Sequence, residues 1–258
     1  MRKLYALLMV LFTPVGSLLA ACTATEKNTD YTVDNGPSNS VSLNANINAV
    51  GDLVAFGVWC YPSCTPVSVT LGSQTAVQTT VSGNPGGGSP GTGQGFIFYI
   101  PSATFSGSQT ATWTVSGTHS GIQFSYLDFS PSAGCHFTHN VDSPLGSGTG
   151  DTANTPSITP SAGDLLVNFT WISEHVTSVN SPWSCANFHL PGETQTCFAV
   201  NTFNTLAYIL SAASGSTANN MTLIHPTDDW QALITSFSMS SSQAQAPQPP
   251  TNLQATVQ

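Results

Sequence analysis

Three side chains that can bind metals lie close together in the segment Cys135-His136-Phe137-Thr138-His139. Thiolates and imidazoles are the usual ligands of structural zinc, which needs four of them in a tetrahedral arrangement. The chain contains no second Cys/His cluster that would complete such a site. On a strand, His136 and His139 would also point to opposite faces. We therefore predict no metal site and no cofactor, with Cys135 in a loop and two histidines that pack or face solvent.

Carboxylates that could hydrolyse a glycosidic bond are scarce. Glycosidases place two Asp or Glu side chains beside the scissile bond, and the glutamates of this chain are Glu26, Glu174 and Glu193. Glu26 is expected in a polar tether, which leaves Glu174 and Glu193, with Asp228-Asp229 as further acids. Neither glutamate lies in a strand pattern like that of jelly-roll glycosidases. We expect solvent-facing loop carboxylates and no catalytic residues.

A glycine-rich stretch from Gly83 to Gly95 contains two matches to catalytic or cofactor motifs. Gly87-Gly88-Ser89-Pro90-Gly91 fits the nucleophile elbow, and the same stretch begun at Gly86 fits a dinucleotide-binding loop. Both motifs need a strand, a tight turn and then a helix. The residues that follow, Phe96 to Ile100, are typical of a strand. We interpret the stretch as a flexible loop.

The first residues have the organisation of an export signal. Met1-Arg2-Lys3 is a short basic region, and Leu4 to Val15 is apolar but too short to span a bilayer. We predict a signal peptide over residues 1–21. Leu19-Ala20-Ala21-Cys22 resembles the bacterial lipobox, which implies a lipid on Cys22 and a membrane attachment at the cell surface or outer membrane. The alternative is ordinary secretion, with cleavage near Cys22 or Ala24.

The six cysteines suit an oxidising compartment. A lipid on the first of them would leave five for disulfides, an odd number. Cys60 and Cys64 could close a small turn, and Cys185 with Cys197 a longer loop. Cys135 would then remain as a buried thiol. Spacing alone does not determine connectivity, so these pairs are hypotheses.

The charge content excludes one class of function. Only 6% of the residues are charged, the formal net charge is −9, and no Lys or Arg follows Lys27. Nucleic-acid binding depends on clustered Lys and Arg side chains that neutralise phosphates. We therefore exclude nucleic acid as a partner.

Strand patterns fill the chain after the signal. Apolar residues alternate with Ser, Thr and Gln around Val69, Trp113 and Phe124, which is the period of half-buried antiparallel strands. Leu53 to Trp59 and Leu206 to Leu210 are apolar throughout, as strands between two layers are. The sequence predicts an all-β fold, an antiparallel β-sandwich of the jelly-roll type.

An internal similarity accompanies these strands. Gly51-Asp52-Leu53-Val54 leads to Trp59, and Gly163-Asp164-Leu165-Leu166 leads to Trp171 with the same spacing. Two related half-sandwiches, or pseudo-symmetric strands of one sandwich, would explain it. We prefer a single sandwich domain over residues 41–239.

The segments that flank this domain are polar. Residues 22–40 are rich in Asn, Asp and Thr and are interpreted as a tether. Residues 240–250 form a linker rich in Pro, Ser and Gln. Residues 251–258 look like the start of a fibronectin type III module.

The order of these strands resembles secreted bacterial β-sandwich domains of unassigned role, which are commonly followed by Ig-like or fibronectin type III modules. The resemblance rests on the two Gly-Asp-Leu strands, the strand Phe96-Ile97-Phe98-Tyr99 and the closing strand from Trp230 to Met239. It carries no catalytic residues over to this chain.

The expected function is therefore a non-catalytic surface module with an adhesion or binding role, displayed by a lipid anchor. Its partner would be an extracellular glycan or a surface protein. One alternative is a carbohydrate-binding module, for which Trp183, in a predicted loop, is the candidate for stacking on a ligand. A further alternative is a jelly-roll glycoside hydrolase.

Overall fold

The computed structural model describes residues 21–34, 36–61, 64–79, 93–119, 121–172, 176–185, 204–223 and 229–241. Every regular element within these ranges is a β-strand. The strands form antiparallel sheets that pack face to face. The predicted all-β sandwich class is confirmed.

The first half of the chain forms two facing sheets. Their strands are β1 (Ala24–Asp34), β2 (Ser38–Ile47), β3 (Leu53–Tyr61), β4 (Pro66–Leu71), β5 (Gln74–Thr75), β6 (Val77–Gln78), β7 (Gln94–Ile100), β8 (Gly107–His119) and β9 (Gly121–Pro131). Sheet A has the order β1-β9-β3-β7-β6, and sheet B has the order β2-β8-β4-β5. The pairs β1–β9, β2–β8, β3–β7 and β4–β5 are nested hairpins. A long hairpin rolled into two sheets in this way is a jelly roll.

The second half repeats this arrangement. Its strands are β10 (Cys135–Asp142), β11 (Gly146–Thr149), β12 (Thr152–Asn154), β13 (Leu165–Ile172), β14 (Val176–Val179), β15 (Ser184–Cys185), β16 (Asn204–Ile209), β17 (Asn220–Leu223) and β18 (Asp229–Ser241). Sheet C has the order β10-β18-β13-β16-β15, and sheet D has the order β12-β17-β14. β11 also pairs with β18, so β10 and β11 together take the place of β1. The segment predicted as one sandwich is therefore two jelly rolls.

The turns before β3 and β13 show how closely the two halves correspond. The N–H of Gly51 donates to the carbonyl of Ala103 at 2.8 Å, and the N–H of Gly163 donates to that of Ala212 at 2.8 Å. Both glycines have a positive φ, 97° and 88°, a conformation that residues with a Cβ rarely adopt. The repeated Gly-Asp-Leu sequence thus marks the same turn in each jelly roll.

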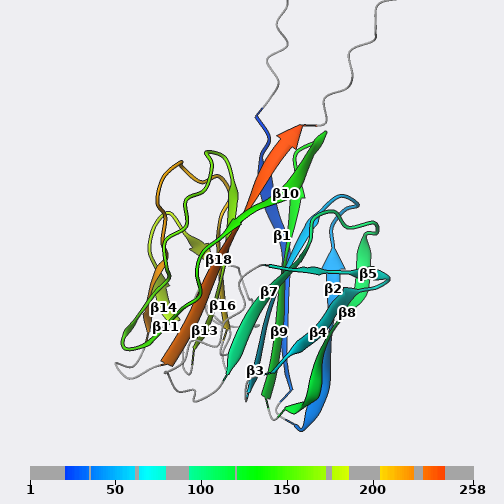
Figure 1. Cartoon of the computed structure of the whole chain (residues 1–258). Coiled ribbons are helices and arrows are strands. Elements are labelled where there is room, and N and C mark those ends of the chain that lie inside the picture. The colour runs from blue at the N-terminus through cyan, green and yellow to red at the C-terminus, as the bar shows by residue number, and fades with distance from the viewer. Residues whose placement is uncertain are drawn as a thin grey trace, which may run out of the picture.

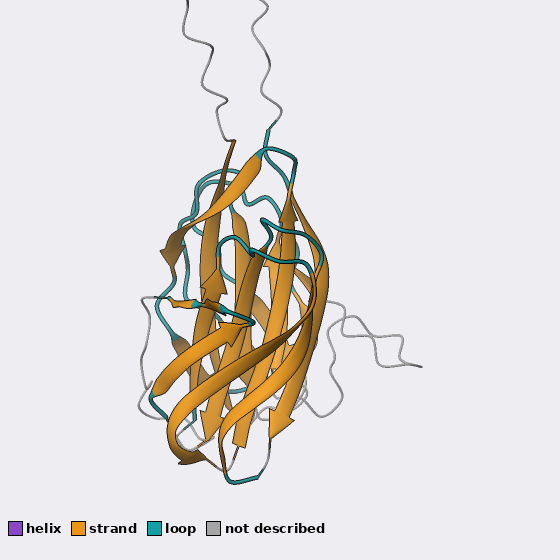
Figure 2. Ribbon diagram, turned by 90° about the vertical axis from the view of Figure 1, so that its right-hand side faces the viewer, coloured by secondary structure: helices purple, strands orange, loops and turns teal. Residues whose placement is uncertain are grey.

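The four sheets stack in the order B, A, C, D. One core fills the space between sheets B and A and includes Phe56 and Trp113. A second core lies between sheets A and C and includes Phe129 and Phe169, and a third lies between sheets C and D and includes Met221. In Figure 1 the first jelly roll is on the right and the second on the left. Figure 2 views the stack from the side of the first jelly roll.

Strand β3 explains why some runs are apolar throughout. Phe56 and Val58 face the core shared with sheet B, whereas Leu53 and Ala55 face the core shared with sheet C. Successive side chains of a strand point to opposite faces. A central strand covered on both faces therefore needs apolar residues at every position.

The predicted tether over residues 22–40 is wrong for most of its length. Ala24–Asp34 is β1, the edge strand of sheet A, which pairs with β9 along its whole length. Asn28 Nδ2 donates to Asp128 Oδ2 at 3.1 Å, and Thr29 Oγ1 donates to the carbonyl of Tyr126 at 2.8 Å. Backbone pairing and polar contacts hold this strand in place. At the other end β18 extends to Ser241, and the remainder of the predicted linker and tail lies outside the described residues.

Candidate functional site

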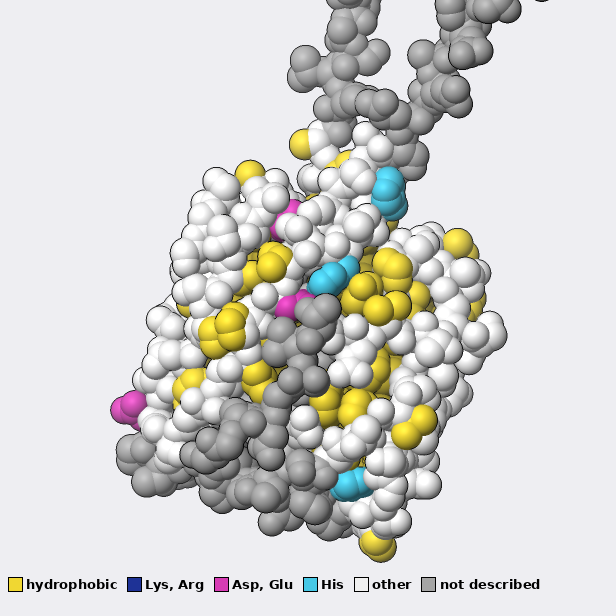
Figure 3. All heavy atoms as spheres, viewed as in Figure 1, with side chains coloured by type: hydrophobic (Ala, Val, Ile, Leu, Met, Phe, Trp, Pro, Cys, Tyr) yellow, Lys and Arg dark blue, Asp and Glu magenta, His cyan; other side chains and the backbone are white. Residues whose placement is uncertain are grey.

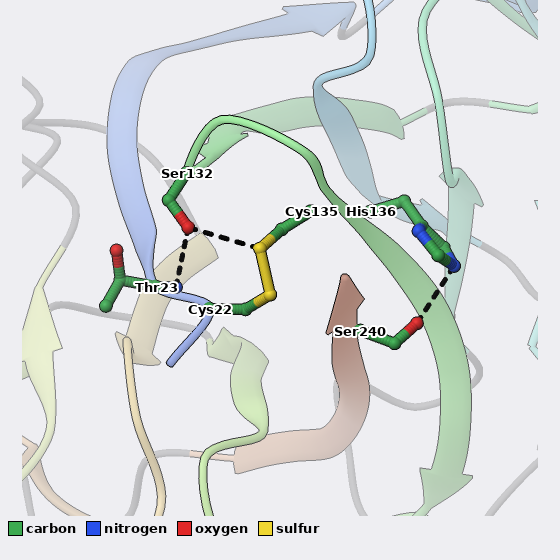
Figure 4. Close-up of a disulfide and its surroundings, with 6 residues drawn as sticks. All are labelled: Cys22, Thr23, Ser132, Cys135, His136 and Ser240. Atoms are coloured by element: carbon green, nitrogen blue, oxygen red, sulfur yellow. Dashed lines mark hydrogen bonds between the residues drawn. A yellow bond between two sulfur atoms is a disulfide. The ribbon is translucent and has the colours of Figure 1, made fainter. Parts of the chain in front are cut away.

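A disulfide joins the beginnings of the two jelly rolls. Cys22 precedes β1, Cys135 begins β10, and their Cα atoms are 5.9 Å apart (Figure 4). Ser132 Oγ accepts from the backbone N–H of Thr23 at 3.1 Å and donates to Cys135 Sγ at 3.3 Å. We call this bond, together with Ser132, the clasp. Because β1 and β10 hold equivalent places in sheets A and C, the clasp links equivalent ends of the two repeats.

The clasp corrects one expectation about the cysteines and bears on a second. Cys135, predicted as an unpaired thiol, is bonded to Cys22. That expectation failed because it assigned Cys22 to a tether remote from the folded body. A lipid on Cys22 would need a thioether at the sulfur that forms this bond, so the disulfide and the lipid exclude each other. Lipidation of Cys22 stays a prediction.

The other cysteines agree with an oxidised state. The predicted pair Cys60–Cys64 is confirmed, with Cα atoms 6.1 Å apart. Cys185 is disulfide-bonded, and its partner lies outside the described residues. Cys197 is also outside them, so the pairing of Cys185 with Cys197 stays a prediction.

Two equivalent aromatic contacts join sheets A and C. Tyr99 on β7 meets Phe237 edge-on, with ring centroids 5.3 Å apart, and Tyr208 on β16 meets Phe129 edge-on at 5.5 Å. Tyr99 stands opposite Ala55 and Tyr208 opposite Val167, so the two tyrosines hold the same position in their sheets. Each jelly roll thus inserts one tyrosine against a phenylalanine of the other.

The polar partners of these tyrosines differ. His139 stacks on Tyr99 with centroids 5.1 Å apart, and its Nε2 lies 2.9 Å from Asp142 Oδ1. At the equivalent place, Glu26 accepts a hydrogen bond from the Tyr208 hydroxyl at 3.4 Å. Burial raises the pKa of Glu26, and burial and the nearby Glu26 carboxylate raise the pKa of Tyr208 to about 12. These groups lie at the junction of the repeats and stabilise it.

The two histidines of the segment considered for metal binding lie apart from each other. His136 is exposed and pairs with Ser240 Oγ at 2.9 Å, while His139 is half-buried against Tyr99. No group of three or more His, Cys, Asp or Glu side chains within the described ranges could hold a metal ion. Glu174, Glu193, Asp228 and the glycine-rich motif lie outside the described residues, so no carboxylate pair for hydrolysis can be placed.

The prediction that Trp183 offers a stacking surface is wrong. Its side chain is only 6% exposed and belongs to the core between sheets C and D. Its indole Nε1–H donates to the carbonyl of Ala218 at 3.0 Å. The four other tryptophans are Trp59, which is half-buried, and the buried Trp113, Trp171 and Trp230. Trp183 and these three buried tryptophans therefore offer no face for stacking on a ligand.

A cavity of about 310 Å³ opens at the end of the first jelly roll that lies away from the clasp. It is lined by Cys64, Thr65, Pro66, Gln78, Gln94 and Phe96. The side-chain amides of Gln78 and Gln94 form no hydrogen bond within the described part of the chain. The described residues of the lining contain no charged group, so the cavity suits a neutral ligand that can both donate and accept hydrogen bonds.

No protein-family model matches the chain, and no curated protein resembles it closely enough to count as a relative. The fold and the clasp therefore define its class, a duplicated jelly-roll protein with its repeats packed back to back. Within the described ranges, no helix has the length and apolar character needed to cross a membrane.

Proposed function

We propose that the chain is an exported extracellular module with an adhesion or binding role, and that it binds its partner at the end away from the clasp. The observation that carries this proposal is the position of the termini. Both described chain ends leave the body at the clasp end (Figure 1). Attachment through either terminus would leave the opposite end free to meet a partner.

The cysteines support export. Every cysteine in the described ranges is oxidised, and such bonds persist in oxidising compartments. Because Cys22 is part of the clasp, cleavage of the predicted signal peptide should leave Cys22 in the mature protein. Ordinary secretion with cleavage before Cys22 fits this requirement better than lipidation.

Several strands begin or end at the end away from the clasp. β3 ends there at Tyr61, and Tyr61 pairs with Gly121 at the start of β9. In the second jelly roll β13 ends and β18 begins at the same end, where Ile172 pairs with Trp230. Loops mounted on a scaffold of strands are the usual place for binding residues.

The chemistry of the surface favours an uncharged partner. The described part of the face seen in Figure 3 is mostly uncharged, with several groups of hydrophobic side chains, isolated acidic and histidine side chains, and no Lys or Arg. The cavity with Gln78 and Gln94 lies at the proposed binding end and is also uncharged. This favours carbohydrate binding as a second, more specific candidate, since sugar hydroxyls both donate and accept hydrogen bonds.

Two exposed valines provide a matched test of the binding end. Val67 lies at the start of β4, near the cavity, and is 62% exposed, whereas Val50 lies at the clasp end and is 66% exposed. We expect the wild-type protein to bind at least one polysaccharide on an array of neutral glycans. Val67→Arg should weaken that binding about tenfold or more, and Val50→Arg should leave it unchanged. Equal losses from both substitutions, or no binding to any glycan on the array and to intact cells, would contradict the proposal.

The carbohydrate candidate has its own test. Gln78→Ala combined with Gln94→Ala removes both free amides and should reduce glycan binding about tenfold, because each lost hydrogen bond costs on the order of 1 kcal/mol. Gln74→Ala is the control, since its amide already donates to the carbonyl of Ser102 and accepts from the N–H of Thr104. If the double variant binds as the wild type does, sugar recognition by this cavity is ruled out, while the choice of binding end is still decided by the valine pair.

A further inference from the structure

Two buried carboxyl groups face each other in the first jelly roll, near the clasp. Asp52 ends the turn before β3, and Asp128 lies on β9 opposite Val54. Their side chains are 1% and 0% exposed. Both carboxyls are too deeply buried to contact a substrate.

Each carboxyl has donors for one oxygen and none for the other. Asp52 Oδ2 accepts from the N–H of Ala49 at 2.8 Å. Asp128 Oδ2 accepts from the N–H of Asn48 at 2.9 Å and from Asn28 Nδ2 at 3.1 Å. Oδ1 of Asp52 and Oδ1 of Asp128 are both buried without a donor. Two ionised carboxylates in this position would repel each other and leave two buried acceptors unsatisfied, which is costly.

The second jelly roll has a neutral residue, Ser236, at the position of Asp128, so its buried aspartate has no acid beside it. Asp164 is the equivalent of Asp52, and its Oδ2 accepts from the N–H of Ser161 at 3.0 Å and from Asn140 Nδ2 at 2.7 Å. Its Oδ1 accepts from Ser238 Oγ at 2.9 Å. Ser236 pairs with Leu166 in the second jelly roll, and Asp128 pairs with Val54 in the first, so Ser236 and Asp128 hold equivalent positions. Asp164 thus has a donor for both oxygens and no second acid beside it.

We propose that Asp52 and Asp128 share one proton, and that its loss as the pH rises weakens the attachment of β1 and of the β2–β3 turn in the first jelly roll alone. The proton turns one carboxyl into the donor that the other lacks. It thereby satisfies both buried oxygens at once. Asn28 and Asn48 connect the pair directly to β1 and to the turn after β2.

The surrounding groups favour retention of the proton. The pKa of Asp128 is raised to about 7, mainly by burial and also by the charge and hydrogen bond of Asp52. Tyr126 on the same strand and Asp30 on β1 are titratable groups nearby. Burial and the charges of Asp30 and Asp128 raise the pKa of the Tyr126 hydroxyl. Lys27 on β1 is exposed and forms no ion pair with either carboxyl in the described structure. No cation therefore compensates for the loss of the proton.

The sign of the effect follows from proton binding. In the unfolded chain an aspartate releases its proton near pH 4, whereas in the folded chain the pKa of Asp128 is raised to about 7. The folded state thus binds more protons across this interval, and stability falls as the pH rises through it. Above the folded pKa the contribution of the shared proton is lost.

Thermal unfolding at pH 5 and pH 9 tests the proposal. The wild-type melting temperature should fall by about 5 °C or more between these values, since one pKa unit corresponds to a few degrees in a chain of this size. Asp128→Asn places an amide donor next to Asp52 Oδ1 and should remove most of this fall. Ser236→Ala, at the equivalent position of the second jelly roll, should retain it. An unchanged pH dependence in Asp128→Asn would overturn the proposal.

A direct titration keeps the proposal testable if Asp128→Asn does not fold. Carbon-13 NMR of the aspartate carboxyls in the wild-type protein should show one group with a titration midpoint above about pH 6. Amide hydrogen exchange at pH 9 should be faster in β1 than in β10, after correction for intrinsic rates. Ionisation of all aspartates below pH 5, or equal protection of β1 and β10, would refute the shared proton.

Discussion

The two jelly rolls have the same strand order, yet they differ where they meet. Gly57 on β3 and Phe169 on β13 hold equivalent positions, four residues after Leu53 and Leu165. A Cβ on Gly57 would overlap the Phe169 ring. Two copies of one sheet face cannot pack with a large side chain at the same central point on both. The first repeat provides the space and the second fills it.

The same contrast appears beside the tryptophans. Gly95 on β7 pairs with Trp59 on β3, whereas Asn204 on β16 pairs with Trp171 on β13. A Cβ on Gly95 would lie 2.5 Å from Trp171 Cε3. At these two positions sheet A therefore contributes glycines to the shared core, and sheet C contributes aromatic rings. The repeats have become complementary halves of one interface.

Removal of the clasp should have the largest effect on the joined repeats. The combined change Cys22→Ser and Cys135→Ser opens a loop with a sequence separation of 113. The free energy of unfolding should fall by about 4 kcal/mol, because a long closed loop restricts the unfolded chain most. Guanidinium unfolding measures this loss. The matched control, Cys60→Ser with Cys64→Ser, opens a separation of only 4 and should cost about 2 kcal/mol.

Equal losses from the two cysteine pairs would show that the clasp does not constrain the chain as a long loop. A loss confined to the first jelly roll would also contradict its role as a link between repeats. Hydrogen exchange of β9 and β18 distinguishes these results, since both strands are paired on both sides and report on separate repeats.

Gly57→Ala should have the next largest effect. The added methyl group forces the Phe169 ring out of its place between sheets A and C, and overpacking of this kind costs about 3 kcal/mol. Chemical unfolding measures the cost. In a Phe169→Leu background, the same substitution should cost much less, because the ring that it meets is absent. Strictly additive effects of the two substitutions would contradict the proposed complementarity of the sheets.

The polar contacts at the edge strands should give the smallest effects and should differ between repeats. Asn140 Nδ2 donates to Asp164 Oδ2 at 2.7 Å, whereas Asn28 Nδ2 donates to Asp128 Oδ2 at 3.1 Å. We expect Asn140→Ala to lower the free energy of unfolding by about 2 kcal/mol and Asn28→Ala by about 1 kcal/mol, since the shorter bond to a carboxyl is stronger. Parallel urea titrations measure the difference. A larger loss from Asn28→Ala would reverse this ranking.

Much of the fold could be predicted from the sequence because the buried strands carry a clear apolar pattern. The runs Leu53 to Trp59 and Leu206 to Leu210 are apolar since both their faces are covered. The pair Cys60–Cys64 was predictable because the two cysteines are close in sequence. The repeated Gly-Asp-Leu turn revealed duplication, although it did not distinguish one sandwich from two.

The elements that escaped prediction depend on contacts between distant parts of the chain. β1 has almost no apolar alternation, because an edge strand is held by backbone pairing with β9. Trp183 donates a hydrogen bond to Ala218, which is 35 residues away in the chain. The residues next to Trp183 in the sequence give no sign of this contact. The clasp joins residues 113 positions apart, and Cys22 lies beside a lipobox-like sequence that suggested another fate. No local pattern could have paired it with Cys135.

Disulfide mapping of the exported protein tests the central claim most directly. The mature chain should be purified after secretion, digested without reduction and analysed by mass spectrometry. We predict a peptide pair joined through Cys22 and Cys135, with the first residue of the mature chain at or before Cys22 and no lipid on that cysteine. A mature chain that begins with a lipid-modified Cys22, together with a free Cys135 thiol, would contradict the link between the two jelly rolls.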